Sequence, residues 1–297
     1  MTATTTLRLG TRGSRLAIAQ AQLAVGALRQ MLGIDSLEVV EIRTTGDAIS
    51  DRRPAGTLVV GDGQFTGELE QALLENRIDI AVHSLKDLPT ASSVGLRLGA
   101  ILERGDPRDC LLSRHPGGFD GLPLGAEIGT SSVRRAAQLA AARVDLVARP
   151  IRGNVDTRLR RLEAGEYDAL LLAAAGLDRL GIPPREDDRL SLDLMLPAPG
   201  QGALALQVRA GDAMLLAALD HAPTRIAVEA ERALLLALGG GCLAPLGALG
   251  EVRHGKLRLR AAYEGSGGFA RVDVTGPADR SAEVVAETTA RIMEATA

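Results

Sequence analysis

Apolar positions along the first two thirds of the chain follow two alternating spacings. Short, nearly continuous apolar runs predict buried strands at residues 7–9, 37–42, 78–82, 127–129, 144–148, 169–173 and 203–208. Between these runs, apolar positions recur at helical spacing. This predicts helices over residues 14–32 and 68–75, and further helices beginning at Ser132 and Val155. Strands that alternate with helices are typical of α/β domains whose sheets are substantially parallel.

Two segments rich in turn-forming residues interrupt this alternation. Residues 102–108 contain a glycine and a proline, and residues 196–202 contain two of each. We predict that the first segment is a crossover and that the second is a further crossover or a hinge. From residue 223 the pattern changes, and it predicts one long helix to residue 238, strands near 248–252, 257–262 and 271–274, and a final helix over 282–293. This last part is expected to form a small, separate α+β domain.

The composition narrows the classes of function. The chain has 297 residues, which is enough for two or three domains. A net charge of −3 argues against a general binder of nucleic acid or of membrane surfaces. Residues 1–10 show no secretory signal, and no apolar run approaches the length of a membrane span. We therefore expect a cytoplasmic protein that binds neither nucleic acid nor membrane.

Three predicted strand-to-helix junctions carry arginine beside small or hydroxyl residues. They are Arg12-Gly13-Ser14-Arg15, Gly129-Thr130-Ser131-Ser132-Val133-Arg134-Arg135 and Ile151-Arg152-Gly153-Asn154-Val155-Asp156-Thr157-Arg158. Unpaired backbone N–H groups at a helix N-terminus favour anions, and arginine adds a planar charged fork that suits carboxylates and phosphates. The repetition of this arrangement indicates a ligand with several acidic groups.

A further polar segment, from His83 to Thr90, follows the predicted strand at 78–82. Ligands of α/β sheets usually bind at the carboxyl ends of strands, so this is a candidate site. Lys86 and Asp87 would equally suit a solvated pair of charges in a turn that Pro89 ends. Both interpretations stay open on the chemistry alone.

The two cysteines, Cys110 and Cys242, are too few for a disulfide framework or a metal cluster. Cys110 precedes two leucines and is expected to be a small core residue. Cys242 follows a run of three glycines and precedes Pro245, which predicts a loop at the end of a helix. This setting suits an accessible, nucleophilic or attachable thiol as well as it suits a core residue.

Other chemical templates are absent from the sequence. It contains no GxxxxGK[ST] phosphate loop and no GxSxG elbow, and the segment Gly61-Asp62-Gly63-Gln64 lacks the third glycine of a dinucleotide fingerprint. The four histidines are scattered without the spacing of metal ligands. We therefore predict no metal site.

Taken together, these segments resemble the porphobilinogen deaminase family of tetrapyrrole biosynthesis. The resemblance runs from the N-terminus to about residue 247. It rests on motifs that occur in the order of the family: Thr11-Arg12-Gly13-Ser14, His83-Ser84-Leu85-Lys86-Asp87-Leu88-Pro89-Thr90, Gly129-Thr130-Ser131-Ser132-Val133-Arg134-Arg135, Ile151-Arg152-Gly153-Asn154-Val155, Ala175-Gly176-Leu177-Asp178-Arg179-Leu180, Pro199-Gly200-Gln201-Gly202 and Gly240-Gly241-Cys242.

The resemblance implies an α/β protein of three domains. Two would be lobes like those of type II periplasmic binding proteins, placed around a cleft. Residues 1–101 and 198–220 would form the first, discontinuous lobe, and residues 102–197 the second. Residues 221–297 would form a small C-terminal α+β domain that carries Cys242. A monomer is expected.

The activity that the resemblance implies is that of hydroxymethylbilane synthase. This transferase joins four porphobilinogen molecules head to tail, releases ammonia and yields linear hydroxymethylbilane. Cys242 would hold a dipyrromethane cofactor by a thioether bond, and Asp87 would be the catalytic carboxylate. Cofactor contacts are further implied for Lys86, Ser132, Arg134, Arg135 and Gly153. Contacts with substrate carboxylates are implied for Arg12, Ser14, Arg152, Arg158 and Arg179.

The chain also departs from the pattern of the family. Asp62 and Gly67 stand where basic residues are usual, and Gly239 stands where an acidic residue is common. No cofactor contact is therefore assigned to the loop around Asp62. Two other functions are weighed, a two-lobed receptor for a polycarboxylate and an arginine-dependent binder of nucleic acid. The second is disfavoured because aromatic residues, on which bases would stack, make up only 2% of the chain.

Overall fold

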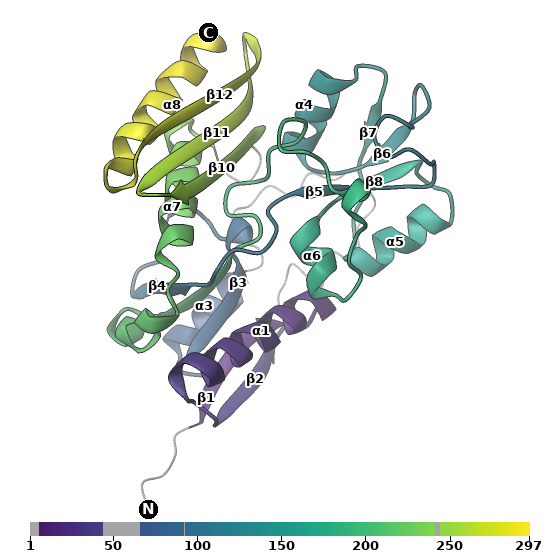
Figure 1. Cartoon of the computed structure of the whole chain (residues 1–297). Helices are drawn as coiled ribbons and strands as arrows, with labels where there is room; N and C mark the ends of the chain where they lie inside the picture. Colours follow the sequence, from purple (N-terminus) through teal and green to yellow (C-terminus); the bar gives the residue numbers. More distant parts are fainter. Residues whose placement is uncertain (1–5, 44–65, 92, 241–243) are drawn as a thin grey trace, which may run out of the picture.

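The first sheet of this computed structural model has five strands and lies in the lower part of Figure 1. The structure describes residues 6–43, 66–91, 93–240 and 244–297. The strands of the first sheet run in the order β2 (Leu37–Ile42), β1 (Leu7–Arg12), β3 (Ile80–Ser84), β9 (Leu204–Arg209) and β4 (Leu96–Ile101). β1 is parallel to β2 and β3, whereas β9 is antiparallel to both of its neighbours.

Helix α1 (Arg15–Leu32) packs against this sheet, and local signals set both of its ends. Ser14 is the N-cap, as predicted, and its Oγ accepts a hydrogen bond from the backbone N–H of Ala17 at 3.2 Å. Gly33 ends the helix with a φ of 63°, a left-handed conformation that glycine adopts without strain. Helix α3 (Gly67–Leu74) and the 3₁₀ segments η1 (Leu85–Asp87) and η3 (Ala210–Leu219) complete this part.

The second sheet belongs to the teal part of Figure 1. Its strands run in the order β5 (Asp109–Ser113), β8 (Ala169–Ala173), β6 (Glu127–Gly129) and β7 (Val147–Arg149). β6 is parallel to β7 and β8, and β5 is antiparallel to β8. The helices are α4 (Val133–Ala142), α5 (Val155–Glu163) and α6 (Ala174–Arg179), and η2 (Glu186–Asp188) follows them.

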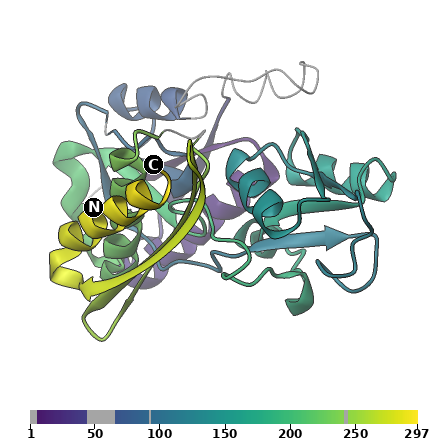
Figure 2. The same ribbon diagram turned by 90° about the horizontal axis from the view of Figure 1, so that it is seen from above.

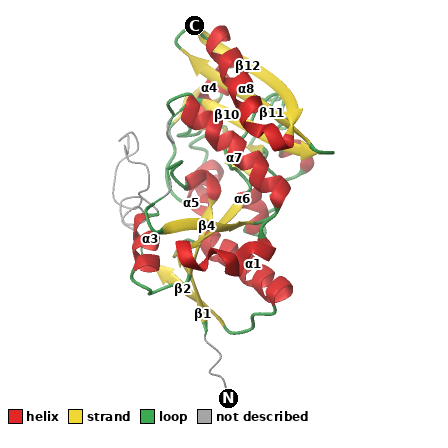
Figure 3. Cartoon of the chain, turned by 90° about the vertical axis from the view of Figure 1, so that its left-hand side faces the viewer, coloured by secondary structure: helices red, strands yellow, loops and turns green. Residues whose placement is uncertain are grey.

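The third part is an antiparallel sheet covered by two helices, as Figure 3 shows at its top. The strands β10 (Leu246–Arg253), β11 (Lys256–Gly265) and β12 (Gly268–Pro277) form a meander. Helices α7 (Ala222–Ala237) and α8 (Ser281–Ala295), which follows η4 (Ala278–Arg280), pack on this sheet. Leu234, Leu259 and Ile292, all fully buried, join both helices to the sheet in one core. The predicted α+β tail is confirmed.

A buried carboxylate ties the third part to the other two. Glu231 of α7 is fully buried and forms an ion pair with Arg104, whose Nη1 lies 2.5 Å from its Oε1. The same carboxylate accepts hydrogen bonds from the backbone N–H groups of Gly200 at 2.6 Å and Gly250 at 2.8 Å. Arg104 and Gly200 lie in the two predicted crossovers, which connect the two α/β sheets. Viewed from above, the yellow C-terminal part and the teal part lie on opposite sides of these connections (Figure 2).

The structure confirms the mixed α/β class with a small C-terminal domain, and it corrects several details. β4, β5 and α6 were not predicted, and the sheets are only partly parallel because β4, β5 and β9 run antiparallel to their partners. β7 begins at Val147, three residues later than predicted, because residues 143–146 form a turn in which the N–H of Leu146 donates to the carbonyl of Arg143 at 3.2 Å. The proposed limits of the domains stay a prediction, which the membership of β9 in the first sheet supports.

Of the residues that depart from the pattern of the family, the structure describes Gly67 and Gly239 but not Asp62. Gly239 ends α7 with a φ of 68°, where an acidic side chain would be strained. Gly67 is the first residue of α3. Asp62 and Cys242 lie outside the described residues.

The buried position of Glu231 leads to a prediction about stability. Replacing Glu231 by Ala leaves the Arg104 guanidinium and two backbone N–H groups without their partner, so the native state should lose roughly 3–5 kcal/mol. The exposed Glu229 of the same helix pairs with Arg225 at 3.0 Å, and its replacement by Ala should cost at most about 0.5 kcal/mol. Urea unfolding followed by circular dichroism measures both. Equal midpoints for the two variants would contradict a structural role for Glu231.

Candidate functional site

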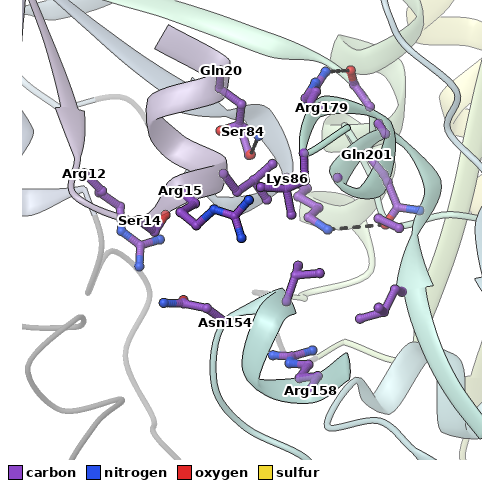
Figure 4. Close-up of a pocket in the computed structure, with 18 of the residues that line it drawn as sticks. Arg12, Ser14, Arg15, Gln20, Ser84, Lys86, Asn154, Arg158, Arg179 and Gln201 are labelled. Carbon is purple, nitrogen blue, oxygen red and sulfur yellow. Dashed lines mark hydrogen bonds between the residues drawn. The ribbon is translucent and has the colours of Figure 1, made fainter. Parts of the chain in front are cut away.

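A cavity of about 210 Å³ lies where the two α/β sheets face each other. Cationic side chains from both sides line it, and Figure 4 shows Arg12 and Arg15 beside α1, with Asn154 and Arg158 on the opposite side. Of the predicted site residues it brings together Arg12, Ser14, Lys86, Arg135, Gly153, Arg158 and Arg179. The junctions that the sequence marked as suited to anions therefore share one cavity.

The topology explains this convergence. β1 and β3 are parallel, so Arg12 at the end of one strand and Lys86 just after the other lie at the same edge of the first sheet. β6, β7 and β8 are parallel to one another, so the junctions before α4, α5 and α6 share one edge of the second sheet. The chain places these two edges on opposite walls of the cavity.

A second cavity of about 220 Å³ lies between the first sheet, α4 and the third part. The predicted residues Lys86, Asp87, Ser132, Arg134 and Arg135 line it, and Lys86, Arg135 and Gln201 also line the first cavity. Apolar atoms come from Leu88, Pro89, Leu235, Ala244 and Leu246. Ala244 is two residues beyond Cys242, so the chain reaches this cavity next to the predicted attachment residue.

Arg134 and Arg135 are held by a carboxylate that sequence reasoning missed. Asp109 is fully buried, and its two oxygens lie 2.7 Å from Arg134 Nη1 and 2.7 Å from Arg135 Nη2. Burial alone would raise the pKa of Asp109, but the two guanidinium groups hold it well below its usual range. Gln201 also donates to Asp109 at 2.8 Å. The two arginines therefore share one negative charge, and their predicted contacts with the cofactor stay a prediction.

The Nε atoms of Arg134 and Arg135 are buried and have no hydrogen-bond partner within the described part of the chain. Such buried donors are costly unless something accepts from them. Asp109 thus leaves one N–H donor of each arginine, at Nε, without an acceptor in the described chain.

No local pattern marked Asp109 as a site residue, because it begins a strand that was not predicted. Its neighbour Cys110 is a buried core residue as expected, and burial raises the pKa of its thiol to about 12.

Lys86 is the cation whose charge is most sensitive to its surroundings. Its Nζ lies 3.5 Å from Oε1 of Gln201. Burial lowers the pKa of Lys86 to about 8; nearby Asp87 opposes this shift and Arg135 reinforces it. Because this pKa lies close to neutrality, a carboxylate bound beside Lys86 would stabilise its charged form.

Asp87 is the last residue of η1, directly after Lys86, and its side chain is exposed at the second cavity. It also lines a smaller cavity of about 70 Å³ together with Arg12, Ser14 and His83. The carboxylate of Asp87 makes no hydrogen bond to another residue of the described chain. His83 is buried and bound to Gln207 at 3.0 Å, and burial lowers its pKa to about 4, so it is neutral at physiological pH. Because no hydrogen bond within the described chain occupies it, the carboxylate of Asp87 is available to a ligand.

Two further predicted arginines are fixed by backbone carbonyls. Arg158 donates through Nε to Gly153 at 2.8 Å, and Arg179 donates through Nη2 to Gly202 at 2.5 Å. Burial lowers the pKa of each guanidinium to about 10, which leaves both charged near pH 7. Arg152 precedes Gly153 in the same loop and is half-buried, but it lines neither the first nor the second cavity.

Several lining residues carried no prediction. Arg15, Gln20, Ser84 and Gln201 line the first cavity, and Arg232 lines the second. Arg15 and Gln201 lie within motifs that the sequence had marked, so proximity to those motifs could have signalled them. Arg232 lies on α7 and donates to the carbonyl oxygens of Leu88 at 3.0 Å and Pro89 at 2.5 Å. These contacts span more than 140 residues and leave no local signal.

The described residues contain neither a cluster of metal ligands nor a helix that could span a membrane. No group of three or more His, Cys, Asp or Glu side chains there could hold a metal ion. None of the helices in the described ranges combines the length and apolar character needed to cross a bilayer.

Comparison with known proteins gives concordant results over nearly the whole chain. Residues 7–217 match the family model for the dipyrromethane cofactor binding domain of porphobilinogen deaminase, and residues 225–294 match that for its C-terminal domain. The porphobilinogen deaminase of Desulforudis audaxviator is 50% identical over 292 residues, which cover 96% of this chain and 94% of the relative. The porphobilinogen deaminase of Thermus thermophilus is 47% identical over 282 residues, which cover 93% of this chain and 91% of the relative.

Among solved structures, a periplasmic substrate-binding protein of an ABC transporter from Coxiella burnetii superimposes with a TM-score of 0.44 at 14% identity. The superposition covers 72% of this chain and 91% of that protein. The family assignment rests on the sequence relatives, since the two family matches together span both α/β sheets and the C-terminal part. This chain belongs to the porphobilinogen deaminase family.

Proposed function

We propose that this chain condenses four porphobilinogen molecules head to tail on its cofactor and releases one ammonia for each. One water then cleaves the bond between the cofactor and the tetrapyrrole, which supplies the hydroxyl group of the product, hydroxymethylbilane. The observation that carries the proposal is the row of cationic side chains that both sheets direct into one cavity, which continues at Lys86 and Arg135 into the second. Porphobilinogen bears two carboxylates, and each added pyrrole brings two more. A growing chain of this kind needs several fixed cations along its path.

The second cavity fits the dipyrromethane cofactor that the family carries. Its arginines and Lys86 suit carboxylates, its apolar residues suit flat pyrrole rings, and the buried Nε atoms of Arg134 and Arg135 lack an acceptor within the described chain. We propose that Cys242 holds the cofactor and that Lys86, Ser132, Arg134 and Arg135 contact it in this cavity. Gly153 lines the first cavity, and its proposed contact with the cofactor would come from that side. When bound, the cofactor supplies the free pyrrole carbon to which the first substrate unit is joined.

We assign the substrate carboxylates to Arg12, Ser14, Arg158 and Arg179, which line the first cavity, and to Arg152, which lies in the loop beside Gly153 but lines neither cavity. Arg158 and Arg179 are already oriented by carbonyl groups, so binding costs little further ordering of their side chains. Ser14 caps α1, whose first backbone N–H groups add partial positive charge at the same place. These contacts would hold the aminomethyl group of the substrate in a constant orientation.

We propose that Asp87 assists the chemical step. In each condensation the C–N bond of the aminomethyl group breaks and ammonia leaves, which makes the substrate cationic. A carbon–carbon bond then forms to the free pyrrole carbon, which loses its proton. A carboxylate fixed beside the reacting ring stabilises the developing positive charge and can accept a proton from a pyrrole. The carboxylate of Asp87 follows Lys86 just after β3 and is exposed at the second cavity, which supports this role.

We further propose that the protein works as a cytoplasmic monomer without nucleic-acid or membrane partners. The net charge of −3 supports the second part of this proposal, because the phosphates of nucleic acids and of anionic membrane surfaces attract proteins with an excess of positive charge.

Covalent attachment of the cofactor gives the most direct test. The purified protein should weigh more than its sequence by one dipyrromethane on Cys242, because that cysteine is the attachment residue we propose. Intact-mass spectrometry measures the adduct, and an acidic aldehyde reagent should colour it. Cys242→Ser should lose both adduct and activity, whereas Cys110→Ser, which changes a buried and unreactive thiol, should keep both. Full activity without an adduct would refute the attachment.

The proposed role of Asp87 predicts that a substitution of nearly the same size but without the charge slows ammonia release. Asp87→Asn removes the charge that stabilises the cationic intermediate, so ammonia release in a single turnover should slow by about 100- to 1,000-fold. Asp87→Glu keeps the charge but moves it by one methylene, and it should retain more activity than the Asn variant. Cofactor content is checked first on each variant. If Asn and wild type release ammonia equally fast, Asp87 has no part in the chemistry.

The pKa of Lys86 predicts how cofactor loading depends on pH. Its pKa in the free protein is about 8, and only the protonated form attracts a carboxylate. The charged fraction, and with it the rate of loading of cofactor-free protein, should fall about tenfold between pH 7 and pH 9. Lys86→Arg stays protonated over this range and should show a flatter profile. Mass spectrometry after timed incubation with porphobilinogen gives the loading rates. If wild type and Lys86→Arg show the same dependence on pH, the charge of Lys86 has no part in cofactor loading.

A further inference from the structure

Arg15 and Asp156 form an ion pair that spans the first cavity. Arg15 is the first residue of α1, and Asp156 lies in the first turn of α5, 141 residues later. Nη1 of Arg15 lies 2.6 Å from Oδ1 of Asp156, and both residues line the cavity. In Figure 4 the Arg15 guanidinium extends between Arg12, Lys86 and Asn154. The pair therefore lies within the space that we assign to the substrate.

Arg15 differs from the other arginines of this cavity in how it is held. Arg158 and Arg179 donate to backbone carbonyls, and Arg135 is buried against Asp109. The side chain of Arg15 is 67% exposed, and Asp156 is its one hydrogen-bond partner within the described chain. Exposed ion pairs contribute little to stability because water solvates both partners. A ligand carboxylate can therefore replace Asp156 at small cost.

Among the described residues that line this cavity, Asp156 is the one acidic residue, and it faces six cationic residues (Arg12, Arg15, Lys86, Arg135, Arg158 and Arg179). Its position in the first turn of α5 also suits its charge, since the N-terminus of a helix stabilises an anion. The helix N-terminus therefore still interacts favourably with this carboxylate after Arg15 leaves it. The carboxylate of Asp156 therefore occupies the position beside Arg15 that a carboxylate of a ligand would take.

We propose that Arg15 is a further carboxylate-binding residue of this cavity, and that Asp156 occupies it internally until a substrate carboxylate displaces it. The inference rests on the proposed function, because the displacing group is a carboxylate of porphobilinogen or of the growing chain. Asp156 then acts as an intramolecular competitor that weakens substrate binding. Its removal should strengthen binding, whereas loss of Arg15 should weaken it.

Steady-state kinetics of the holoenzyme with porphobilinogen separate this competition from a structural ion pair. Arg15→Gln should raise KM by about 5- to 20-fold through the lost charge-assisted contact. Asp156→Asn should lower KM by about 2- to 5-fold because Arg15 is released. In both, kcat should stay within about twofold, since neither residue touches the reacting atoms. In the double variant, Asp156→Asn should bring no gain. Arg291→Gln, which breaks an exposed pair with Glu287 in α8, is the matched control and should leave KM unchanged.

The direction of the two effects decides the matter. A pair that only joins the two walls would be broken by either substitution, so a rise of KM in both variants would overturn the proposal. An unchanged KM in Arg15→Gln, or an equal change in Arg291→Gln, would overturn it as well. Failure of the wild-type protein to consume porphobilinogen would overturn the proposed function, and this inference with it. Turnover by the wild type with no effect at Arg15 would overturn the inference alone.

Discussion

The fully buried carboxylate of Asp109 fixes the wall that the two cavities share. It binds Arg134, Arg135 and Gln201, which come from α4 and from the second crossover. Two guanidinium groups side by side repel each other, and in a buried setting neither could keep its place without a compensating charge. One carboxylate for two arginines leaves a net positive charge at the wall. The residue that organises the site is thus one that a ligand need not touch.

Glu231 has the corresponding role for the arrangement of the three parts. Its carboxylate joins α7 to Arg104 in the first crossover and to Gly200 in the second. Both crossovers connect the two sheets, so the third part is fastened where the chain passes between them. Arg232, the next residue of α7, holds the loop after Lys86 and Asp87 through the carbonyl groups of Leu88 and Pro89. Glu231 and Arg232, two neighbouring residues of α7, therefore connect the C-terminal part to both crossovers and to the loop that follows Asp87.

The cations of the site fall into two groups with different physics. Arg134, Arg135, Arg158 and Arg179 are buried or held by carbonyls and carboxylates, so they form a charge pattern that exists before any ligand arrives. Such preorganisation lowers the ordering cost of binding. Lys86 and Arg15 are adjustable, the first because its pKa lies near 8 and the second because its partner is exchangeable. An enzyme that lengthens its product needs fixed contacts for position and exchangeable ones for movement.

The amino-acid sequence determined what depends on neighbours in the chain. Most strand and helix positions followed from apolar spacing, although β4, β5 and α6 were missed. Ser14 and Ser132 were recognisable as the start of helices because a cap acts within three residues. The anion-binding junctions were recognisable for the same reason. Tertiary structure alone decided the pairing of Asp109 with Arg134 and Arg135, the hub at Glu231 and the contact between Arg15 and Asp156. Those partners lie between 19 and 141 residues apart, and no local pattern records which distant charges the sheets bring together. The antiparallel course of β9 belongs with them, because strand direction depends on where the chain returns from the second sheet.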